Sequence, residues 1–367
     1  MRILSLSDLS SLTLVPLSEH ELVKEIKLLT AGFTDKRENI GDYVLSEKAI
    51  SAYAKFYLPT NMPKLYFLYD RLKEQHGLKF FEQISQLTFI DFGSGPGTFS
   101  LAHLFYMQSL GLSVKKVHLI DSSSLMLKQA TLIMKAFFPK VEIQLGRDIK
   151  LTDLKEKSFL FFGHSLNELS EEDLQSNLFQ QTMNHEFISM ISWIEPGTPA
   201  FFHKQKKLRE NLISAKWDIL YPCANNSLCP LQYETEEWCH QILRVTHHEE
   251  IERVSQLVQL DRKILPMSAF FWQRSENKTI VESEIKAFPI RFLDETKFSF
   301  DFLFCGNFSA ENSLQLKKGE VLKRHLNKSE TKILKHRSLG HPLLKSEIEF
   351  KNDFFRVKKI YLPEEES

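Results

Sequence analysis

Hydrophobic positions recur at helical spacing through the first 85 residues. Ser18-Glu-His-Glu21 has the pattern of a capping box, in which a serine and a glutamate three residues later satisfy free N–H groups at a helix start. Leu22, Ile26 and Leu29 then follow at the spacing of one helical face. We therefore predict a helical N-terminal region over residues 1–85.

The same period returns twice more before residue 85. It runs from Tyr43 to Tyr57, and again from Leu65 to Phe81 with Leu65, Leu68, Tyr69 and Leu72 on one face. Pro59 and Pro63 lie between these segments. Because proline lacks the N–H that a helix interior needs, we expect the two prolines to separate two helices.

From Leu87 the pattern changes to short apolar runs that alternate with helical segments. The helices are expected at Phe99–Leu110 and Ser122–Phe138. The predicted strands are Leu87–Phe92, Val117–Ile120, Val141–Leu145, Ser158–Phe162 and Pro199–His203. Such alternation indicates βαβ units and a parallel sheet. We predict an α/β domain with a Rossmann-like core over residues 86–216.

After residue 216 the alternation stops and period-2 patterns follow. The strand candidates are Met267–Trp272, Phe288–Phe292, Phe298–Phe304 and Val357–Leu362. We expect a mostly β C-terminal unit, divided into a cysteine-containing region over 217–305 and a basic, β-rich region over 306–367.

Charge adds a local feature to this picture. The chain has 47 Lys plus Arg and 47 Asp plus Glu, so its net charge offers no general attraction for nucleic acid. Residues 317–337 nevertheless carry eight basic side chains against Glu320 and Glu330; the eight are Lys317, Lys318, Lys323, Arg324, Lys328, Lys332, Lys335 and Arg337. A smaller cluster comprises Lys204, Lys206, Lys207 and Arg209. These clusters are either phosphate-binding patches or solvated surface.

The sequence favours a cytoplasmic protein without a membrane segment. No stretch reaches the roughly 18 consecutive apolar residues that a spanning helix needs. Residues 1–19 lack the basic start and continuous apolar run of a signal peptide. We expect a monomer.

A glycine-rich loop is the main candidate for ligand binding. Asp91-Phe-Gly93-Ser-Gly95-Pro-Gly97-Thr98 lies between a predicted strand and a predicted helix, where glycines allow a close approach to a ligand. Asp121 ends the next strand, where a carboxylate can accept hydrogen bonds from ribose hydroxyls.

The spacing of the glycines bears on which cofactor binds. It is G-x-G-x-G, which resembles motif I of class I methyltransferases rather than the G-x-G-x-x-G of dinucleotide-binding folds. We therefore expect S-adenosylmethionine, with a dinucleotide-binding module as the alternative. The candidate cofactor-binding residues are Asp91, Gly93, Ser94, Gly95, Gly97, Thr98, Asp121, Ser122, His164 and Asn167.

The end of the fourth predicted strand reads Gly163-His-Ser-Leu-Asn-Glu168. The Asn/Asp-Pro-Pro-aromatic motif that many amino-methylating enzymes carry at this position is absent. His164, Asn167 and Glu168 are polar groups near the methyl donor or, equally, helix-capping residues. No catalytic residue is assigned, and whether the chain is an active enzyme stays open.

The four cysteines are spaced as Cys223-x5-Cys229-x9-Cys239-x65-Cys305. Four thiolates suit zinc or an iron–sulfur cluster. Their spacing matches no common zinc motif, and free cysteines are often unrelated core residues. Both interpretations stay open on spacing alone.

The sequence around the cysteines resembles one methyltransferase-like family. Tyr221-Pro-Cys223-Ala-Asn-Asn-Ser-Leu-Cys229-Pro-Leu231 and Trp238-Cys239-His240 are similar to the P-C-P-H-x-x-x-C-P-L and W-C-H-F runs of the methyltransferase-like seventeen family of mitochondrial small-ribosomal-subunit assembly proteins and its bacterial relatives. Four other segments are also similar, namely Tyr53–Pro59, the glycine loop, His164–Leu169 and Ile194–Pro199. The sequence departs from the family pattern at Ala224 and Asn225.

The resemblance covers roughly residues 50 to 305 and has specific implications. It implies a class I S-adenosylmethionine-dependent methyltransferase fold, and a [4Fe–4S] cluster on Cys223, Cys229, Cys239 and Cys305, with zinc as the alternative metal. It implies a role in binding 16S-type ribosomal RNA of the small subunit during ribosome assembly. The alternative is an active rRNA methyltransferase with a structural metal site.

Overall fold

A computed structural model describes residues 2–35, 46–148, 154–233, 236–277, 285–308, 313–335, 339–340, 343–344, 348–351 and 354–357. The chain divides into two compact units. Unit 1 comprises Met1–Phe67, Leu78–Ile194 and Val245–Ile264, and unit 2 comprises Leu68–Gly77, Glu195–Arg244 and Leu265–Ser367. The four-part division predicted from the sequence stays a prediction.

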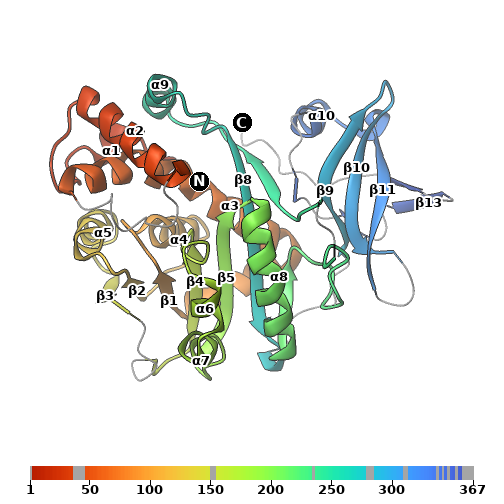
Figure 1. Ribbon diagram of the computed structural model, residues 1–367, viewed down its shortest axis with the longest axis horizontal. Helices are drawn as coiled ribbons and strands as arrows, with labels where there is room; N and C mark the ends of the chain where they lie inside the picture. Colours follow the sequence, from red (N-terminus) through yellow and green to blue (C-terminus); the bar gives the residue numbers. More distant parts are fainter. Residues whose placement is uncertain are drawn as a thin grey trace. The chain divides into compact units, whose positions relative to one another are not determined.

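Unit 1 is built on a parallel sheet with the strand order β3-β2-β1-β4-β5 (Figure 1). The strands are β1 (Thr88–Phe92), β2 (Lys116–Ile120), β3 (Glu142–Gly146), β4 (Ser158–Gly163) and β5 (Ile188–Pro196). In β1, β4 and β5 nearly every residue is buried, as expected when both faces of a parallel sheet are covered. The predicted α/β class and its first four strands are confirmed.

The predicted fifth strand was wrong. Residues 199–203 begin helix α8 (Pro199–Ser214), and the fifth strand is the earlier apolar run of β5. Thr198 caps the helix by accepting a hydrogen bond from the N–H of Phe201, and Pro199 occupies the first turn. Proline suits that position because its missing N–H would have no helical partner there.

The helices of unit 1 are α1 (Leu6–Leu9), α2 (Glu19–Asp35), α3 (Glu47–Ser85), α4 (Thr98–Ser109), α5 (Ser124–Phe137), α6 (Glu171–Gln175), α7 (Asn177–Met183) and α9 (Glu249–Val258). The sequence predicts α2, α4 and α5 close to these bounds, whereas α1, α6, α7 and α9 are not predicted from it. The predicted capping box of α2 forms, because Ser18 and Glu21 exchange hydrogen bonds between side chain and backbone. The start of the helix predicted at residue 43 lies outside the described residues.

The prolines of α3 do not divide it. Pro59 and Pro63 lie inside one helix, and the irregular backbone falls instead at Gly77, with φ +70°. A proline inside a helix costs about 3 kcal/mol. Burial of Phe56, Leu58 and other apolar neighbours offsets this cost. Glycine adopts a positive φ without a Cβ clash, which explains the place of the kink.

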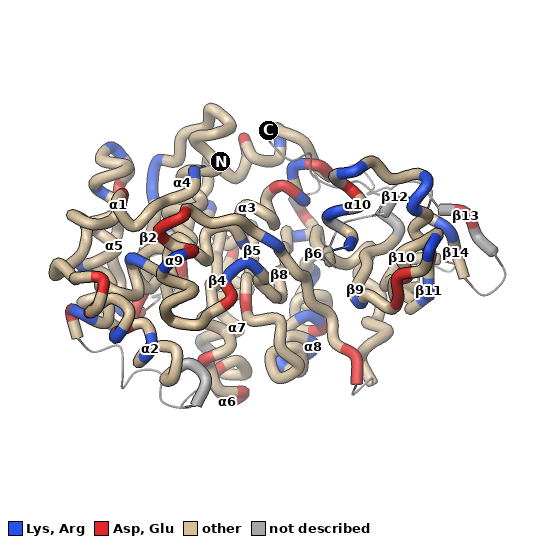
Figure 2. The backbone as a smooth tube through the Cα atoms, turned by 90° about the horizontal axis from the view of Figure 1, so that it is seen from above, with Lys and Arg blue, Asp and Glu red and all other residues tan. Residues whose placement is uncertain are grey.

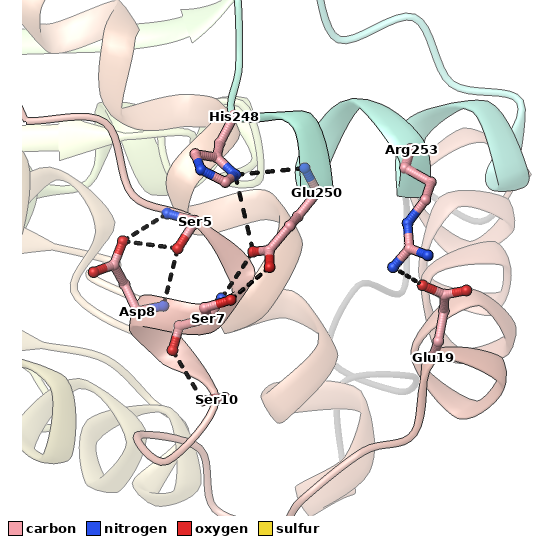
Figure 3. Close-up of polar contacts among 8 residues, drawn as sticks. All are labelled: Ser5, Ser7, Asp8, Ser10, Glu19, His248, Glu250 and Arg253. Atoms are coloured by element: carbon pink, nitrogen blue, oxygen red, sulfur yellow. Dashed lines mark hydrogen bonds and ion pairs between the residues drawn. The ribbon is translucent and has the colours of Figure 1, made fainter.

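The N-terminal helices hold α9 by both apolar and polar contacts. Ile251, Val254 and Val258 of α9 pack with buried residues of α2 and α3. Figure 3 shows the polar side of this contact, where Glu250 accepts hydrogen bonds from Ser7 and where Arg253 pairs with Glu19. The segment Val245–Ile264 is therefore anchored on the N-terminal residues of the chain.

Unit 2 contains α8, a short antiparallel group of strands and a separate six-stranded sheet. β6 (Trp217–Tyr221) pairs antiparallel with β8 (Ile264–Arg274), and β7 (Gln241–Arg244) also pairs with β8. The six-stranded sheet has the order β12-β9-β10-β11-β14-β13. Its strands are β9 (Ile285–Glu295), β10 (Ser299–Asn307), β11 (Leu314–Leu322), β12 (Leu343–Leu344), β13 (Ile348–Lys351) and β14 (Phe354–Val357).

The six-stranded sheet has its own core. Phe300, Phe302 and Phe304 alternate along β10 and pack with Phe355 and Val357 of β14. Helix α10 (Lys328–Lys335) contributes Leu334 to this core. The predicted mostly β C-terminal part is confirmed for the described residues; positions 358–362 of the last predicted strand lie outside them. Within the described part of the chain, none of the helices has the length and apolar character needed to cross a bilayer.

Candidate functional site

A cavity of about 680 Å³ opens at the C-terminal ends of β1, β2 and β4. Gly93 and Gly95 of the glycine loop, Asp121 at the end of β2, and His164 and Glu168 after β4 line it. In open α/β sheets ligands bind at this end of the strands, where the loops diverge. The cavity is therefore where the parallel sheet itself would place a ligand.

Backbone hydrogen bonds hold the glycine loop against β2. The N–H groups of Gly93 and Ser94 both donate to the carbonyl of Ile120, at 2.8 and 3.0 Å. Gly93 has φ +69°, and a Cβ built on it would lie 2.5 Å from the Cβ of Ser165. Gly97, with φ +83°, is the N-cap of α4. The loop therefore requires glycine at both positions.

Asp121 connects the glycine loop to the start of α5. Its Oδ2 accepts a hydrogen bond from the N–H of Gly95, and its Oδ1 accepts one from the N–H of Ser123, each at 2.8 Å. Burial raises the pKa of this carboxyl, and the two backbone hydrogen bonds oppose that rise. An ionised carboxylate has about four acceptor positions. Asp121 therefore keeps acceptor capacity for a ligand in the cavity that it lines.

Asp91 is fully buried and does not line the cavity. Its Oδ2 accepts hydrogen bonds from the backbone N–H and the hydroxyl of Ser100, at 3.1 and 2.7 Å. Burial raises its pKa to about 7. Its Oδ1 has no hydrogen-bond partner among the described residues. Asp91 thus holds the first turn of α4, which directly follows the glycine loop, and does not contact a ligand in the cavity itself.

His164 lies in a positively charged surrounding. Its backbone has φ +61°, a strained conformation for a non-glycine residue, and its N–H donates to the carbonyl of Ile194. Burial, together with the charges of Lys64 and Arg262, lowers its pKa well below the ordinary value. The imidazole is therefore neutral, and its Nε2 accepts a hydrogen bond from Lys64 Nζ at 2.9 Å.

Glu168 is the residue of this loop best suited to exchange a proton near neutral pH. Its side chain is exposed and lines the cavity. Desolvation by the surrounding protein, with a smaller contribution from the charge of Asp121, raises its pKa to about 7. Tyr53 of α3 lines the same cavity, and burial raises its pKa as well.

The structure brings together half of the residues predicted to bind a cofactor. Gly93, Gly95, Asp121, Ser122 and His164 line the cavity. Asp91, Ser94, Gly97, Thr98 and Asn167 are not among its lining residues. Sequence reasoning missed five polar lining residues, namely Tyr53, Ser123, Ser124, Arg147 and Ser165. Tyr53 comes from a helix about 40 positions before the glycine loop, so no local motif could have indicated it.

All four cysteines belong to unit 2 and are free thiols. Cys229, Cys239 and Cys305 share one apolar cluster with Phe202 and Leu231. Burial raises the pKa of Cys305 well above the ordinary value, and the charges of the three other cysteines raise it further. The distant Cys305 therefore lies in the same neighbourhood as the others. Among the described residues, however, no group of three or more Cys, His, Asp or Glu side chains is arranged to hold a metal ion.

The two predicted basic clusters differ in their exposure. Arg209 is buried, donates to the carbonyl of Ser227 and hydrogen-bonds to Cys223, so it belongs to the cysteine neighbourhood and not to the surface. Lys328, Lys332 and Lys335 of α10 are exposed. Figure 2 shows Lys and Arg positions along α10 and around β11 and β14. Arg337 lies outside the described residues.

We predict that Asp91→Asn makes the stability of the protein less dependent on pH. The folded-state pKa of Asp91 is about 7, against 3.8 for an ordinary Asp. The folded state therefore holds the proton more tightly, and its free energy of unfolding falls as the pH rises from about 4 to 7. The neutral amide avoids that loss, so the variant should gain on the order of 2 kcal/mol relative to the natural chain across this window.

The measurement is urea unfolding at pH 4.5 and 7.5. Glu82→Gln, which neutralises an exposed carboxylate of α3, is the control and should leave the pH dependence unchanged. Parallel pH profiles for the natural chain and Asp91→Asn would show that Asp91 titrates normally.

Solved structures resemble this chain at low sequence identity and low TM-score. A search of curated proteins returns no match. Magnesium protoporphyrin IX methyltransferase from Synechocystis PCC 6803 is similar in structure, at 13% identity over 72% of this chain and 100% of that one, with a TM-score of 0.37. A putative RNA methyltransferase from Pyrococcus horikoshii matches at 12% identity over 70% of this chain and 98% of that one, with a TM-score of 0.35. The family model described as mitochondrial small ribosomal subunit Rsm22 matches residues 48–266, more than half of the sequence, and the chain belongs to that family.

Proposed function

We propose that this protein is a methyltransferase-like, S-adenosylmethionine-binding protein that binds small-subunit ribosomal RNA during ribosome assembly. One observation carries the proposal. The glycine loop and Asp121 meet at the C-terminal ends of neighbouring parallel strands and line one cavity. The description of the chain's family names the small ribosomal subunit. We propose further that its four cysteines hold a [4Fe–4S] cluster.

The cavity fits a nucleoside cofactor. Asp121 keeps free acceptor positions for ribose hydroxyls, and Gly95 has no atom within 4 Å of the place where its Cβ would stand. Gly93, Ser122 and His164 line the remaining wall near this carboxylate. S-adenosylmethionine would supply an activated methyl group at this place. The chain's own contribution is to bind and orient the nucleoside through the loop and Asp121.

Asp121→Asn is expected to weaken S-adenosylmethionine binding by about 10- to 100-fold. The amide keeps the size of the side chain but removes the charge, and its NH₂ group faces a backbone N–H. A hydrogen bond to a charged group contributes about 1.5–3 kcal/mol, which corresponds to this range.

Titration calorimetry measures the effect. Glu82→Gln, which neutralises an exposed carboxylate that does not line the cavity, should bind as the natural chain does. Unaltered affinity in Asp121→Asn, with S-adenosylmethionine bound to both proteins, would place the nucleoside elsewhere. Binding of NAD in place of S-adenosylmethionine would establish the dinucleotide-binding alternative.

A second candidate function is methyl transfer to ribosomal RNA, and Glu168 favours it. Its pKa of about 7 leaves this cavity-lining carboxylate partly deprotonated at neutral pH. Such a group can accept a proton from a nucleophile. The neutral His164 beside it offers a second polar contact.

We expect the purified protein to co-sediment with small ribosomal subunits at about 50 mM salt and to dissociate at several hundred millimolar. Contacts between cations and phosphates release counterions, so affinity falls steeply with salt. Failure to co-sediment with small subunits or their precursors at low salt would contradict the proposed role.

Adding S-adenosylmethionine with a radiolabelled methyl group to the same particles separates the two candidate functions. Labelling of the rRNA that is lost in Glu168→Gln would establish methyl transfer.

The cysteine site is proposed on the chemistry of its donors. Four free thiols share one neighbourhood, and three of them lie in one apolar cluster. Soft thiolates are the ligands that iron–sulfur clusters and zinc prefer. In the absence of a metal, burial raises the pKa of Cys229 to about 11, so this thiol is protonated. A bound metal would displace such protons.

Anaerobic purification is expected to give brown protein with about four iron and four sulfide per chain. Cys305→Ser should lose the colour and the metal, because it removes the one ligand from a distant strand. Leu303→Ala, which alters the same apolar cluster without touching a thiol, should keep both. Colourless natural protein with one zinc per chain would show that the site binds zinc and not an iron–sulfur cluster. Protein without either metal would mean that the four thiols are unrelated core residues.

A further inference from the structure

A second cavity, of about 650 Å³, lies at the turn between β9 and β10 in the C-terminal sheet. Four cations, one aromatic ring and one carboxylate contribute to its lining; they are Lys297, Lys323, Arg324, Arg356, Phe298 and Glu320. None of these positions lies in the segment that matches the family model, residues 48–266. The cavity is therefore a feature of this chain that the family match does not explain.

The turn holds Phe298 outward. Its side chain is 71% exposed. The hydroxyl of Thr296 accepts hydrogen bonds from the N–H groups of Phe298 and Ser299, at 3.1 and 2.9 Å, and the N–H of Lys323 donates to the carbonyl of Phe298 at 2.9 Å. A single exposed phenylalanine is ordinary on protein surfaces. Here hydrogen bonds hold the backbone on both sides of Phe298, which restricts where its ring can lie.

The cations around the ring fall into two groups. Lys323 Nζ contacts Glu295 Oε1 at 2.8 Å and the carbonyl of Thr296 at 2.6 Å, and Arg356 Nε contacts Glu320 Oε2 at 3.2 Å. These two cations support the turn and the neighbouring strand.

Lys297 and Arg324 are exposed, and neither forms an ion pair with another described residue. Lys297 Nζ lies 5.6 Å from the centre of the Phe298 ring. These two cations are available to a ligand.

Only tertiary structure assembles this set. The pairing of Ser299 with Leu322 brings the β9–β10 turn to Lys323 and Arg324, and the pairing of Glu320 with Arg356 adds β14. Four cations against Glu320 leave the lining strongly positive. A flat apolar ring beside exposed cations suits a ligand with a π-face and closely spaced negative charges, which is the chemistry of an unpaired nucleotide.

We propose that this cavity, the β9–β10 turn site, binds a short single-stranded segment of RNA, with one base stacked on Phe298 and the adjacent phosphates held by Lys297 and Arg324. The proposal rests on the proposed function, in that it names where the ribosomal RNA partner is contacted. Lys323 and Arg356 are positioning residues that keep the turn and the adjacent strand in place. Because stacking and phosphate contacts do not read base edges, the site binds with little sequence preference.

The test uses the full-length protein and fluorescently labelled ten-nucleotide oligouridine and oligoadenine RNAs, with binding followed by anisotropy. Phe298→Ala is expected to weaken binding about 5- to 20-fold, and Phe298→Leu to weaken it nearly as much, because leucine keeps the apolar volume but not the ring face. Phe298→Trp should restore binding. Lys297→Ala combined with Arg324→Ala should lower the slope of log K against log salt by about 1.4, as expected for two lost phosphate contacts on a single strand.

Matched controls lie on helix α2, far along the chain from the turn. Leu28→Ala removes another exposed apolar side chain, and Lys24→Ala combined with Lys27→Ala removes two other exposed cations. Both should bind RNA as the natural chain does.

Equal loss in the controls and in the turn variants would overturn the site, as would unchanged binding in Phe298→Ala. A preference for duplex over single-stranded RNA would also overturn it. If the natural chain co-sediments with small subunits while Phe298→Ala keeps full affinity for the oligonucleotides, the site fails and the proposed function stands. If the natural chain neither binds these RNAs nor co-sediments, both fail.

Discussion

The parallel pairing of β1 with β2 on one side and β4 on the other is the constraint on which the candidate site depends. This pairing sets Asp91 opposite Leu119 and Phe161. Three chain segments therefore emerge at one edge of the sheet: the glycine loop, the turn at Asp121 and the loop from His164 to Glu168. The hydrogen bond from Gly95 to Asp121 then ties two of the three together. A change of register in either strand pairing would move the glycine loop, Asp121 and the loop from His164 to Glu168 apart.

Burial of charged side chains around this edge determines their chemistry. Asp91 and Glu168 both have a pKa near 7, but they differ in location: Asp91 is buried and accepts hydrogen bonds from the first turn of α4, whereas Glu168 lines the cavity. His164 is driven neutral by burial and by two cations. Acidic groups that hold protons at neutral pH and a histidine that does not are a pattern typical of ligand-binding sites.

In unit 2, the cysteine neighbourhood and the β9–β10 turn site both combine residues that are distant in sequence. Residue 305 on β10 shares the surroundings of three cysteines from a loop more than 60 positions earlier. The β9–β10 turn site likewise combines three strands. Phe300, Phe302 and Phe304 of β10 belong to the core of the sheet, whereas Leu303 and Cys305, at the alternate positions, pack in the cysteine cluster.

Local sequence determined much of this protein. Period and capping residues were enough to place α2, α4, α5 and the first four strands, because hydrogen bonds within a few residues and burial of one face decide those elements. The G-x-G-x-G spacing and Asp121 were enough to locate the cavity, because glycine is required where φ is positive and where Ser165 approaches within 2.5 Å of a Cβ.

Tertiary structure decided the rest. It kept α3 continuous through Pro59 and Pro63, since burial on both sides outweighs a lost hydrogen bond. It made residues 199–203 a helix start, where Thr198 and proline cap the first turn. It removed Arg209 from the basic surface by burying it beside Cys223, and it moved Tyr53 into the cavity and Asp91 away from it. Apart from the start of α8, where the capping residues are local, each of these outcomes depends on packing against residues far along the chain, which no local pattern contains.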